Sequence, residues 1–531
     1  MKLKPNAIKR NPFHYALNYL SSALETDGYH VTTSAISFNV MQNADEWCVA
    51  NVALRGHSES NSYTVMAGLW ELMRKLESWI IDDEVVVCLR EKGVKKEVIA
   101  KMAGRKFEGK VYAVRDGEVL FSGPVMRIEG PKWQVKWVES MFTNHLRRCC
   151  SVATKIARVT TVCTFMDVIL DGSLRRSNDT DGVWTSRSAY LAGATATSNV
   201  KAGRMFNIPW GGTVDHFTIQ SLIVEYFDQN PMFEINLATV RDAQKFAFRS
   251  IIQTYPKNYL LLVDTIGAEI GIEDAIEVLK ELKPKGYSIR IDSGDLAALS
   301  IWARKRLDEE GLDTVKISPS GGLSALTVKS LKEQGCPGSI WMFGEYLQFK
   351  GERSRDGTTL CEPDVNIEFV SKYAGTADGR FESIKLSENP AKNSLPGRLQ
   401  RLRMINEQGE FAGDVIVNLN TMTPPVNGIL TENIRSVRPL KPSKSKTLKA
   451  GTSFYEMLSL IFENGAFVKD VEPLYELENA RAYCKQQLAC LPHKYKRVDG
   501  GHAIYGVGIE KALHMQAYEM GMEQLVVHRT T

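Results

Sequence analysis

Clustered cysteines, which mark many disulfide-bonded and zinc-binding proteins, are missing from this sequence. Its 531 residues include nine cysteines, an odd number, which are scattered apart from the neighbours Cys149 and Cys150, and no CxxC motif occurs. Such a set predicts neither a disulfide framework nor a structural zinc site. We therefore expect a protein of the reducing cytoplasm, and we assign no metal ligand from the sequence.

Long apolar runs and a strong charge imbalance are also missing. No stretch of about eighteen apolar residues is present, so no membrane span is expected. The N-terminal segment is basic but lacks a continuous apolar stretch, which argues against a signal peptide. The net charge of +4 is small for this length. It predicts neither a nucleic acid nor a membrane partner, although it does not oppose an anionic substrate.

The composition is that of a globular protein, and the pattern changes along the chain. Hydrophobic residues make up 44% and charged residues 24% of the sequence, which allows a sizeable core. Residues 62–131 read as helices and short strands. From 133 to 345, helical stretches alternate with short apolar strands that end in small, polar or acidic residues. This alternation predicts a parallel sheet with functional loops at the carboxyl ends of its strands, in either a closed barrel or an open doubly wound sheet.

The alternation stops after about residue 348. Residues 350–380 are polar and read as irregular, and a loop followed by strands comes next. Residues 436–451 are basic and contain two prolines, so we predict an exposed linker there rather than a nucleic acid contact. Helices are expected over 476–490 and 508–524.

The strongest local signal for chemistry is YSIRIDSGDLAALS, residues 287–300. Arg290 and Asp292 alternate with isoleucines near the end of an apolar strand, so both lie on one face of it. Ser293 or Asp295 can cap the helix that follows. A guanidinium beside a carboxylate at a strand end suits a sugar phosphate. An ordinary N-capped helix with a surface ion pair explains the same spacing.

Two further segments place titratable groups near strand ends. IPWGGTVDHFTI (208–219) carries Thr213 and His216 after two glycines, and YLLLVDTIG (259–267) contains Asp264 at its strand terminus. An imidazole and a carboxylate at neighbouring strand ends can pair, in which case the carboxylate orients the ring and raises its basicity. Each signal is weak alone, because a single histidine is more often structural.

Two segments suit anions. ISPSGGLSALTVKSL (317–331) combines a strand, a Ser-Gly-Gly turn and a helix, which directs free backbone N–H groups at a phosphate, and 341–347 supplies a neighbouring loop. Arg175, Arg176 and Arg187 lie among polar turn residues, and arginine suits a pyrophosphate because it binds in a bidentate manner. The alternatives are a βα turn without a ligand and a solvated basic loop.

Taken in order, these segments resemble nicotinate phosphoribosyltransferases over nearly the whole chain. RIDSGDLAALS is close to the family's RLDSGDLAYLS, and ATSNVKAG (196–203) resembles GTSNVLAG. The other similar segments are LETDGYHVTT (24–33), VMRIEGP (125–131), SVATKIARV (151–159), KLSENPAKNSLPGR (385–398) and the GHAIY that begins at Gly501. The recurrence of many short motifs in one order carries the resemblance.

The resemblance implies catalytic roles for four residues. His216 matches the family histidine that ATP phosphorylates, and Asp264 matches its carboxylate partner. Asp292 matches the acceptor of the ribose hydroxyls, and Arg290 matches its neighbour on the phosphate side. The implied cofactors are ATP and Mg²⁺, with the metal held mainly by the substrate and water.

Substrate-binding roles are implied for a second set of residues. Ser198 stands where the family contacts the pyridine carboxylate, and where a relative that uses nicotinamide has an aspartate. Arg175 and Arg176 match the pyridine and pyrophosphate arginines. Tyr29 matches a tyrosine that stacks on the pyridine from the second subunit, which implies a homodimer. The remaining binding residues are Thr213, Ser293 and those of the 5′-phosphate loops, Ser320, Gly321, Gly322 and Gly344.

The implied fold is an irregular βα barrel of the type II phosphoribosyltransferase kind, with a second α/β domain formed by both chain ends. The barrel takes residues 136–350, and the second, sandwich domain takes 1–135 and 351–531, the latter with a terminal helical or linker extension. The implied reaction joins nicotinate to the ribose of phosphoribosyl pyrophosphate. It gives nicotinate mononucleotide and pyrophosphate, with ATP hydrolysis, for NAD salvage.

Three departures from the family pattern concern substrate contacts. Gly172 replaces the phenylalanine of EFGxRR that stacks on the pyridine, and Glu345 lies in the phosphate loop, where FGVGT becomes FGEYL. Ile266 and Gly267 replace the last two residues of DTYD. These changes leave two alternatives: a phosphoribosyltransferase for another base such as nicotinamide, or a catalytically degenerate homologue with a structural or binding role.

Overall fold

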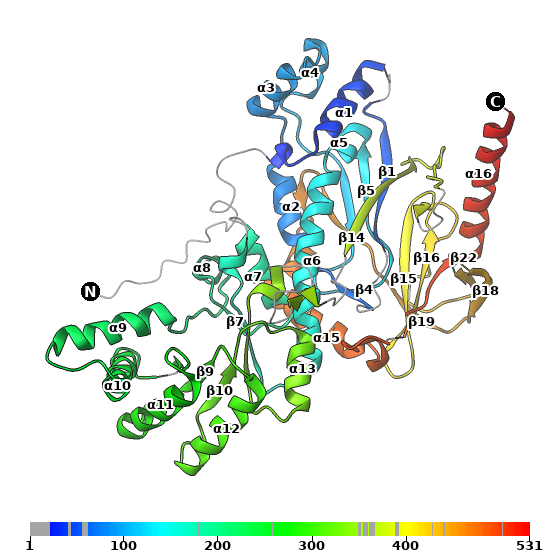
Figure 1. The fold of residues 1–531 in the computed structure, drawn as a ribbon. Coiled ribbons are helices and arrows are strands. Elements are labelled where there is room, and N and C mark those ends of the chain that lie inside the picture. The colour runs from blue at the N-terminus through cyan, green and yellow to red at the C-terminus, as the bar shows by residue number, and fades with distance from the viewer. Residues whose placement is uncertain are drawn as a thin grey trace. The chain divides into compact units, whose positions relative to one another are not determined.

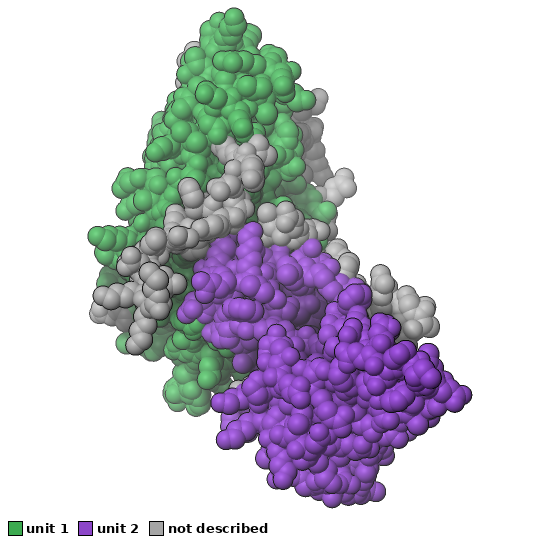
Figure 2. Space-filling model, turned by 90° about the vertical axis from the view of Figure 1, so that its left-hand side faces the viewer, with its two compact units in different colours: residues 1–154, 365–531 green, residues 155–364 purple. Residues whose placement is uncertain are grey.

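In the computed structural model, drawn as a ribbon in Figure 1, the chain divides into two compact units, which Figure 2 shows in different colours. Unit 1 comprises residues 1–154 and 365–531, and unit 2 comprises residues 155–364. The described residues are 22–40, 44–55, 62–177, 181–257, 259–348, 352–353, 359–360, 367–387, 392–426, 428–438, 441–501 and 503–530. The basic N-terminal segment and His502 of the GHAIY motif lie outside the described residues.

Unit 2 is built from short parallel strands that are followed by helices, as the alternating pattern predicts. Its parallel strands form two groups, ordered β10-β9-β8 and β11-β6-β7, and each named pair within them is parallel. A separate antiparallel pair, β12 (Glu352–Arg353) and β13 (Thr359–Leu360), also belongs to this unit. The strands are β6 (Val168–Asp171), β7 (Ala196–Thr197), β8 (Leu260–Leu262), β9 (Ser288–Ile291), β10 (Lys316–Pro319) and β11 (Ile340–Phe343). The N–H of Ser339 donates to the carbonyl of Ile317 (3.1 Å), which joins the two groups between β10 and β11.

Several helices of unit 2 begin directly after a capping side chain. Asp215, Asp295 and Ser324 each accept a backbone N–H of the helix that they precede, and these caps fix the points where strand-end loops turn into helices. The helices are α7 (Asp181–Leu191), α8 (Val200–Phe206), α9 (His216–Gln229), α10 (Leu237–Thr254), α11 (Ala268–Leu282), α12 (Leu296–Glu309), α13 (Ala325–Glu333) and α14 (Glu345–Gln348). A 3₁₀ turn, Leu174–Arg176, follows β6.

Unit 1 contains two six-stranded sheets, ordered β14-β1-β5-β3-β20-β21 and β18-β17-β22-β16-β15-β19. The strands of the first are β1 (Trp47–Arg55), β3 (Lys110–Ala113), β5 (Gly123–Pro131), β14 (Glu368–Thr376), β20 (Ser459–Glu463) and β21 (Ala466–Phe467). Those of the second are β15 (Leu399–Ile405), β16 (Phe411–Asn418), β17 (Ile434–Arg438), β18 (Lys441–Leu448), β19 (Ser453–Glu456) and β22 (Val507–Glu510). Both sheets therefore draw strands from distant parts of the chain.

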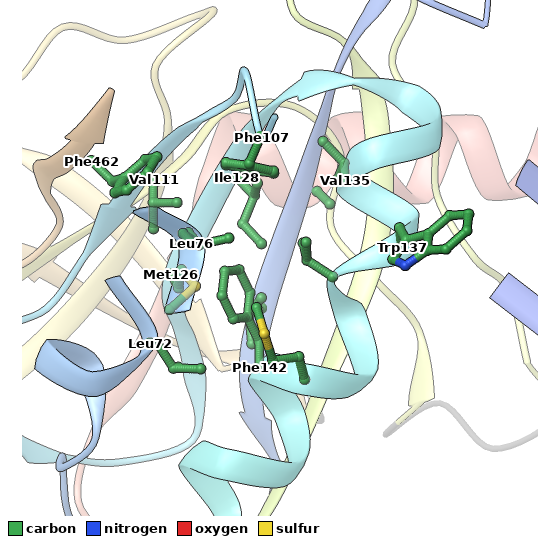
Figure 3. Packing of buried hydrophobic residues seen from close by; sticks show 14 of the residues in the cluster. Leu72, Leu76, Phe107, Val111, Met126, Ile128, Val135, Trp137, Phe142 and Phe462 are labelled. Carbon is green, nitrogen blue, oxygen red and sulfur yellow. The ribbon is translucent and has the colours of Figure 1, made fainter. Parts of the chain in front are cut away.

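Short strands and helices complete unit 1. They are β2 (Thr64–Val65), β4 (Val119–Leu120), α1 (Gly28–Val40), α2 (Leu69–Ser78), α3 (Asp83–Glu91), α4 (Lys96–Met102), α5 (Lys132–Trp137), α15 (Leu477–Cys490) and α16 (Lys511–Thr530), and α6 (Glu139–Val162) begins in this unit. The large core of unit 1 packs side chains from α2, β3, β5, α5, α6 and β20 against one another, including Leu72, Val111, Ile128, Phe142 and Phe462 (Figure 3). Burial of these apolar side chains provides the main driving force for this arrangement.

Two expectations for the C-terminal region are wrong. Residues 436–451 are not a linker, because β17 and β18 pair there as antiparallel strands, with Ile434 opposite Leu448. Residues 350–380 are not irregular throughout, because β14 pairs with β1 over eight positions. The prolines gave a misleading signal because strands at a sheet edge, such as β18, tolerate them. The two expected terminal helices are present as α15 and α16.

Candidate functional site

Arg290, on β9, joins three loops of unit 2. Its Nε donates to Ser320 Oγ (2.8 Å), its Nη1 donates to Thr213 Oγ1 (3.0 Å) and its Nη2 donates to Asp292 Oδ1 (2.9 Å). Ser320 in turn donates its hydroxyl to the same Asp292 oxygen. Arg290 and Asp292 therefore share one face of the strand, as predicted, and their charges are compensated within one hydrogen-bonded group.

Asp264 supports this group from the neighbouring strand end. Its Oδ2 accepts the N–H of Asp292 (3.0 Å) and the hydroxyl of Ser293 (2.6 Å). The side chain is buried, and its Oδ1 has no hydrogen-bond partner among the described residues. The carboxylate thus orients the loop that carries Asp292 and Ser293, and it keeps one oxygen for a further donor.

His216 lies at the first position of α9 and is partly buried. Its Nδ1 contacts Thr265 Oγ1 (3.1 Å), and this contact is with the residue next to Asp264. The hydrogen bonds of Asp264 described above go to β9 and its loop instead. The structure therefore brings His216 to the end of β8, as expected, but the imidazole contacts the threonine hydroxyl. Asp215, the residue before His216, caps α9. Its carboxylate accepts hydrogen bonds from Thr218, and these lower its pKa below the usual value.

The turn after β10 has the geometry of a phosphate-binding loop. Gly321 has φ +90° and Gly322 has φ +63°, and a Cβ at Gly321 would lie 2.7 Å from the carbonyl oxygen of Asp292. Only glycine therefore fits this close approach to β9 without strain. Ser324 then caps α13 by accepting the N–H of Thr327 (3.0 Å). The two glycine N–H groups precede a helix N-terminus, where an anion is favoured.

A cavity of about 170 Å³ lies at the carboxyl ends of these strands. Eight of the residues that the sequence points to line it: Arg175, Arg176, Arg290, Asp292, Ser320, Gly321, Gly322 and Gly344. The other lining residues are Gly172, Leu323, Met342, Glu345 and Tyr346. Its charged lining consists of three guanidinium groups and two carboxylates, which suits a ligand that carries both phosphate and hydroxyl groups.

Five predicted residues of unit 2 lie outside this lining. Thr213, His216, Asp264 and Ser293 belong to the hydrogen-bonded loops described above. Ser198 follows β7, and its N–H donates to the carbonyl of Asp171 at the end of β6 (2.8 Å). Tyr29 belongs to α1 in unit 1, where its side chain is 55% exposed.

Asp171 is a site-supporting residue for which the sequence analysis gives no role. It is buried at the end of β6, and its Oδ1 accepts the N–H (3.0 Å) and the hydroxyl (2.6 Å) of Ser173. Its Oδ2 accepts the hydroxyl of Thr197 on β7 (2.8 Å). Asp171 therefore fixes the turn that leads to the cavity arginines. The signal was available, because Asp171, like Asp292, directly follows an apolar strand segment.

The three arginines of segment 173–190 do not form one cluster on the surface. Arg175 and Arg176 are exposed and line the cavity. Arg187, on α7, is 1% exposed, and its guanidinium carbon lies 5.8 Å from the ring centroid of Phe206. The expectation of a three-arginine anion site is therefore wrong for Arg187, because α7 places its side chain in the interior.

Neither a protein-held metal cluster nor a membrane helix is found in the described part of the chain. Among the described residues, no three histidine, cysteine, aspartate or glutamate side chains are grouped so that they could hold a metal ion. No described helix is long and apolar enough to cross a membrane.

Comparison with known proteins relates this chain to one family. Residues 24–147 match the nicotinate phosphoribosyltransferase N-terminal domain, and residues 398–516 match the nicotinate phosphoribosyltransferase C-terminal domain. A nicotinate phosphoribosyltransferase of Bacillus subtilis is 32% identical over 448 residues, which cover 82% of this chain and 83% of the relative. One from Mycobacterium tuberculosis is 28% identical over 492 residues, which cover 92% of this chain and 91% of the relative.

Solved structures show the same fold. The crystal structure of human nicotinic acid phosphoribosyltransferase superposes with a TM-score of 0.74 at 19% identity, and the match covers 93% of this chain and 99% of the human one. Nicotinate-nucleotide pyrophosphorylase from Pyrococcus furiosus gives a TM-score of 0.60 at 18% identity, over 90% and 97% of the two chains. With the extent and identity of the Bacillus match, these findings show that the chain belongs to the nicotinate phosphoribosyltransferase family.

Proposed function

We propose that this protein is a nicotinate phosphoribosyltransferase, which forms nicotinate mononucleotide and pyrophosphate from nicotinate and phosphoribosyl pyrophosphate. The observation that carries the proposal is the cavity of unit 2, where Arg175, Arg176 and Arg290 meet Asp292 and the Gly321 turn. Guanidinium groups suit the pyrophosphate and phosphate groups of the sugar, and a carboxylate accepts hydrogen bonds from ribose hydroxyls. The identity of the base as a pyridine carboxylate is inferred from membership of the nicotinate phosphoribosyltransferase family.

The chemistry is displacement at ribose C1. Pyrophosphate leaves, positive charge develops on the ring, and the pyridine nitrogen attacks C1, so no protein nucleophile is required. The residues act by positioning and by charge stabilisation. Asp292 holds the ribose, Arg290 keeps Asp292 in place, and the Gly321 turn receives the 5′-phosphate. Ser198 is the proposed contact of the pyridine carboxylate, and Ser293 and Thr213 complete the binding loops.

Mg²⁺ is the proposed metal cofactor, and the residues of the cavity fit it as a companion of the substrate. Asp292 and Glu345 offer hard carboxylate oxygens in the cavity lining. The described residues contain no ready-made metal cluster, which suits an ion that arrives on a pyrophosphate group. When bound, the ion neutralises charge on the leaving pyrophosphate.

ATP is the proposed second cofactor, with His216 as the group that it phosphorylates. Support comes from the place of His216 at the N-terminus of α9, where the helix favours a phosphoryl group, and from its incomplete burial. His216→Ala should abolish ATP-dependent stimulation and leave the fold intact. Incubation with ATP labelled at the γ-phosphate, followed by alkaline gel separation, tests this. Labelling that survives in His216→Ala would refute the assignment.

We further propose the quaternary and domain organisation that goes with this activity. The strands of unit 2 close into an irregular βα barrel over residues 136–350, and both chain ends build the second, sandwich domain. The enzyme is a cytoplasmic homodimer in which Tyr29 of each subunit stacks on the pyridine bound by the other. The exposure of Tyr29 supports this, because an aromatic ring at 55% exposure is available for such a contact.

One observation favours a second candidate function. Glu345 lines the cavity, and Gly172 offers no aromatic ring there. A carboxylate near a phosphate is unfavourable unless a cation lies between them. The alternatives are therefore a phosphoribosyltransferase for another base such as nicotinamide, and a degenerate homologue with a binding or structural role.

Pyrophosphate release distinguishes these functions. The purified protein is assayed with phosphoribosyl pyrophosphate, Mg²⁺ and ATP, in the presence of nicotinate, nicotinamide or no base. The proposed function predicts release with nicotinate that clearly exceeds the other two. Release with nicotinamide alone would identify the other base, and equal background rates in all three would remove the enzymatic function.

A further inference from the structure

We infer that Asp171 is a positioning residue, which holds two substrate-binding segments of unit 2 in one arrangement. The first segment is the arginine turn, residues 172–176, and the second is the base loop, residues 197–199. The inference rests on the proposed function, which assigns the pyrophosphate contact to the arginine turn and the pyridine contact to the base loop. Asp171 is not among the described residues that line the cavity. It therefore acts on a substrate only through the segments that it holds.

The carboxylate of Asp171 divides its two oxygens between these segments. Oδ1 accepts the N–H (3.0 Å) and the hydroxyl (2.6 Å) of Ser173 in the arginine turn. Oδ2 accepts the hydroxyl of Thr197 in the base loop (2.8 Å). Asp171 is only 1% exposed, so these bonds are shielded from water, where hydrogen bonds to a charged group are strong. One buried side chain therefore fixes both segments.

Backbone contacts extend the connection to Ser198, the proposed contact of the pyridine carboxylate. The carbonyl of Asp171 accepts the N–H of Ser198 (2.8 Å). Thr197 Oγ1 accepts the N–H of Asn199 (3.0 Å), so the residue after Ser198 is held by the same hydroxyl that donates to Asp171. The position of Ser198 thus depends on Asp171 through its own backbone and through both of its neighbours.

Thr197→Val tests the connection to the base loop and leaves the carboxylate in place. Valine keeps the shape of threonine but has no hydroxyl, so the bond to Oδ2 and the acceptor for Asn199 are both lost. We expect the KM for nicotinate to rise about tenfold, the scale of one lost hydrogen bond to a charged group. The KM for phosphoribosyl pyrophosphate should change little, because Ser173 keeps its bonds. Thr197→Ser retains the hydroxyl and should keep both KM values near those of the wild type.

Asp171→Ala removes the connections to both segments. The KM values for nicotinate and for phosphoribosyl pyrophosphate should each rise about tenfold or more in steady-state kinetics. A smaller amount of folded enzyme would lower the kcat and leave both KM values unchanged, so the KM values separate positioning from stability. In the double variant Asp171→Ala/Thr197→Val, the KM for nicotinate should rise by clearly less than the product of the two single effects, because both changes break one hydrogen bond.

Asp167→Ala is the matched control, because Asp167 is a buried carboxylate directly before the other end of β6. Its side chain is 4% exposed, and it accepts from Lys332 Nζ (2.7 Å) and Trp341 Nε1 (2.7 Å). Its loss should lower the temperature of thermal unfolding and leave both KM values unchanged. If Asp171→Ala fails to fold, Thr197→Val and Thr197→Ser carry the test.

The outcomes separate this inference from the proposed function. Wild-type KM values in Thr197→Val and Asp171→Ala, when the wild type uses nicotinate, would overturn the positioning role and leave the proposed function in place. Equal increases in Asp167→Ala would also overturn that role, because any buried carboxylate of β6 would then have the same effect. A wild type that forms no nicotinate mononucleotide would overturn the proposed function and the inference with it.

Discussion

At Arg290, three nitrogens of one guanidinium contact three different segments: the loop before α9, the end of β9 and the turn after β10. A lysine at this position has one ammonium group and no planar fork, so it cannot reach all three partners together. The role of Arg290 therefore depends more on the geometry of its guanidinium group than on its charge.

Arg290→Lys should raise the KM for phosphoribosyl pyrophosphate by roughly 10- to 100-fold, since hydrogen bonds to charged groups contribute about 1.5–3 kcal/mol. Steady-state kinetics with saturating nicotinate measure this change. Arg249→Lys on α10 is the control, because Arg249 pairs with Glu281 on the exposed surface. Equal KM values for Arg290→Lys and the wild type would show that Arg290 does not organise the sugar site.

His30 is an unusual buried residue in unit 1. Its side chain is fully buried, and none of the described residues hydrogen bonds to either ring nitrogen. Tyr29 packs against the ring, Glu139 lies 3.8 Å from Nε2, and Lys136 and Asp27 also act on its charge. Burial lowers the pKa of His30, and Lys136 lowers it further. Burial also disfavours the charged form of Glu139, which for a carboxyl group raises the pKa.

The lowered pKa of His30 predicts a pH effect on stability. The unfolded chain binds the proton more tightly than the folded one, so His30 costs stability as the pH falls below the unfolded value of about 6.5. His30→Met should lose less free energy of unfolding than the wild type between pH 7.5 and pH 5.5. At pH 7.5 its stability should lie within about 1 kcal/mol of the wild type or above it. Urea unfolding at both pH values checks this, and parallel losses in the two proteins would contradict it.

At the residue scale, the sequence predicts those features of the site that depend only on the alternation of side chains along a strand or on the residues of a turn. The shared face of Arg290 and Asp292 follows from the period of two, and the Gly321 turn follows from its composition. The contact of His216 with Thr265 could not be predicted, because it depends on how α9 meets the end of β8. Asp171 was missed because one of its partners, Thr197, is distant in sequence and is brought to it by the pairing of β6 with β7.

At the element scale, the turn between β10 and α13 is the feature that the backbone constrains most. Gly321→Ala places a Cβ 2.7 Å from the carbonyl oxygen of Asp292 at a φ of +90°. This substitution should cost about 1–3 kcal/mol of stability through backbone strain, and it should weaken sugar phosphate binding because the turn shifts. Chemical denaturation and pyrophosphate titration measure the two effects.

Gly211→Ala is the control for that substitution. Gly211 has no positive φ, and a Cβ there would meet nothing within 4 Å. Its stability should stay within about 0.5 kcal/mol of the wild type or rise, because alanine restricts the unfolded chain more than glycine does. Equal losses in the two variants would show that the turn after β10 has no special constraint.

Whether a segment forms a helix or a strand was largely predictable from the sequence, but which strands pair with one another was not. Apolar periodicity located β8, β9, β10 and β11 in unit 2, and the capping residue Asp295 located the start of the helix after β9. The hairpin of β17 and β18 was missed because its edge strand is basic and contains proline. Pairing such as that of β1 with β14 joins residues more than 300 positions apart, and no local pattern records it.

At the scale of the whole molecule, the proposed homodimer makes a prediction about mixed subunits. Tyr29 belongs to unit 1 and Arg290 to unit 2, and each active site would take these residues from different subunits. Tyr29→Ala and Arg290→Ala should each be impaired alone. After subunit exchange in a 1:1 mixture, half of the dimers are mixed and each has one complete site, so activity should recover to about a quarter of the wild type.

The control for this experiment is a mixture of either variant with itself. Sedimentation velocity of the wild type establishes the dimer beforehand. Activity of the mixture that stays at the mean of the two variants would show that both residues act within one chain. The sequence alone leads to this organisation only through resemblance, because charge and periodicity carry no information about which subunit supplies a residue.

The most direct test of the central claim is a crystal structure of the protein soaked with phosphoribosyl pyrophosphate, Mg²⁺ and nicotinate. We expect the ribose to contact Asp292, the 5′-phosphate to lie against the Gly321 turn, and the pyrophosphate to face Arg175 and Arg176. A sugar phosphate bound elsewhere, or a cavity closed by the side chain of Glu345 with no ligand in it, would contradict the account.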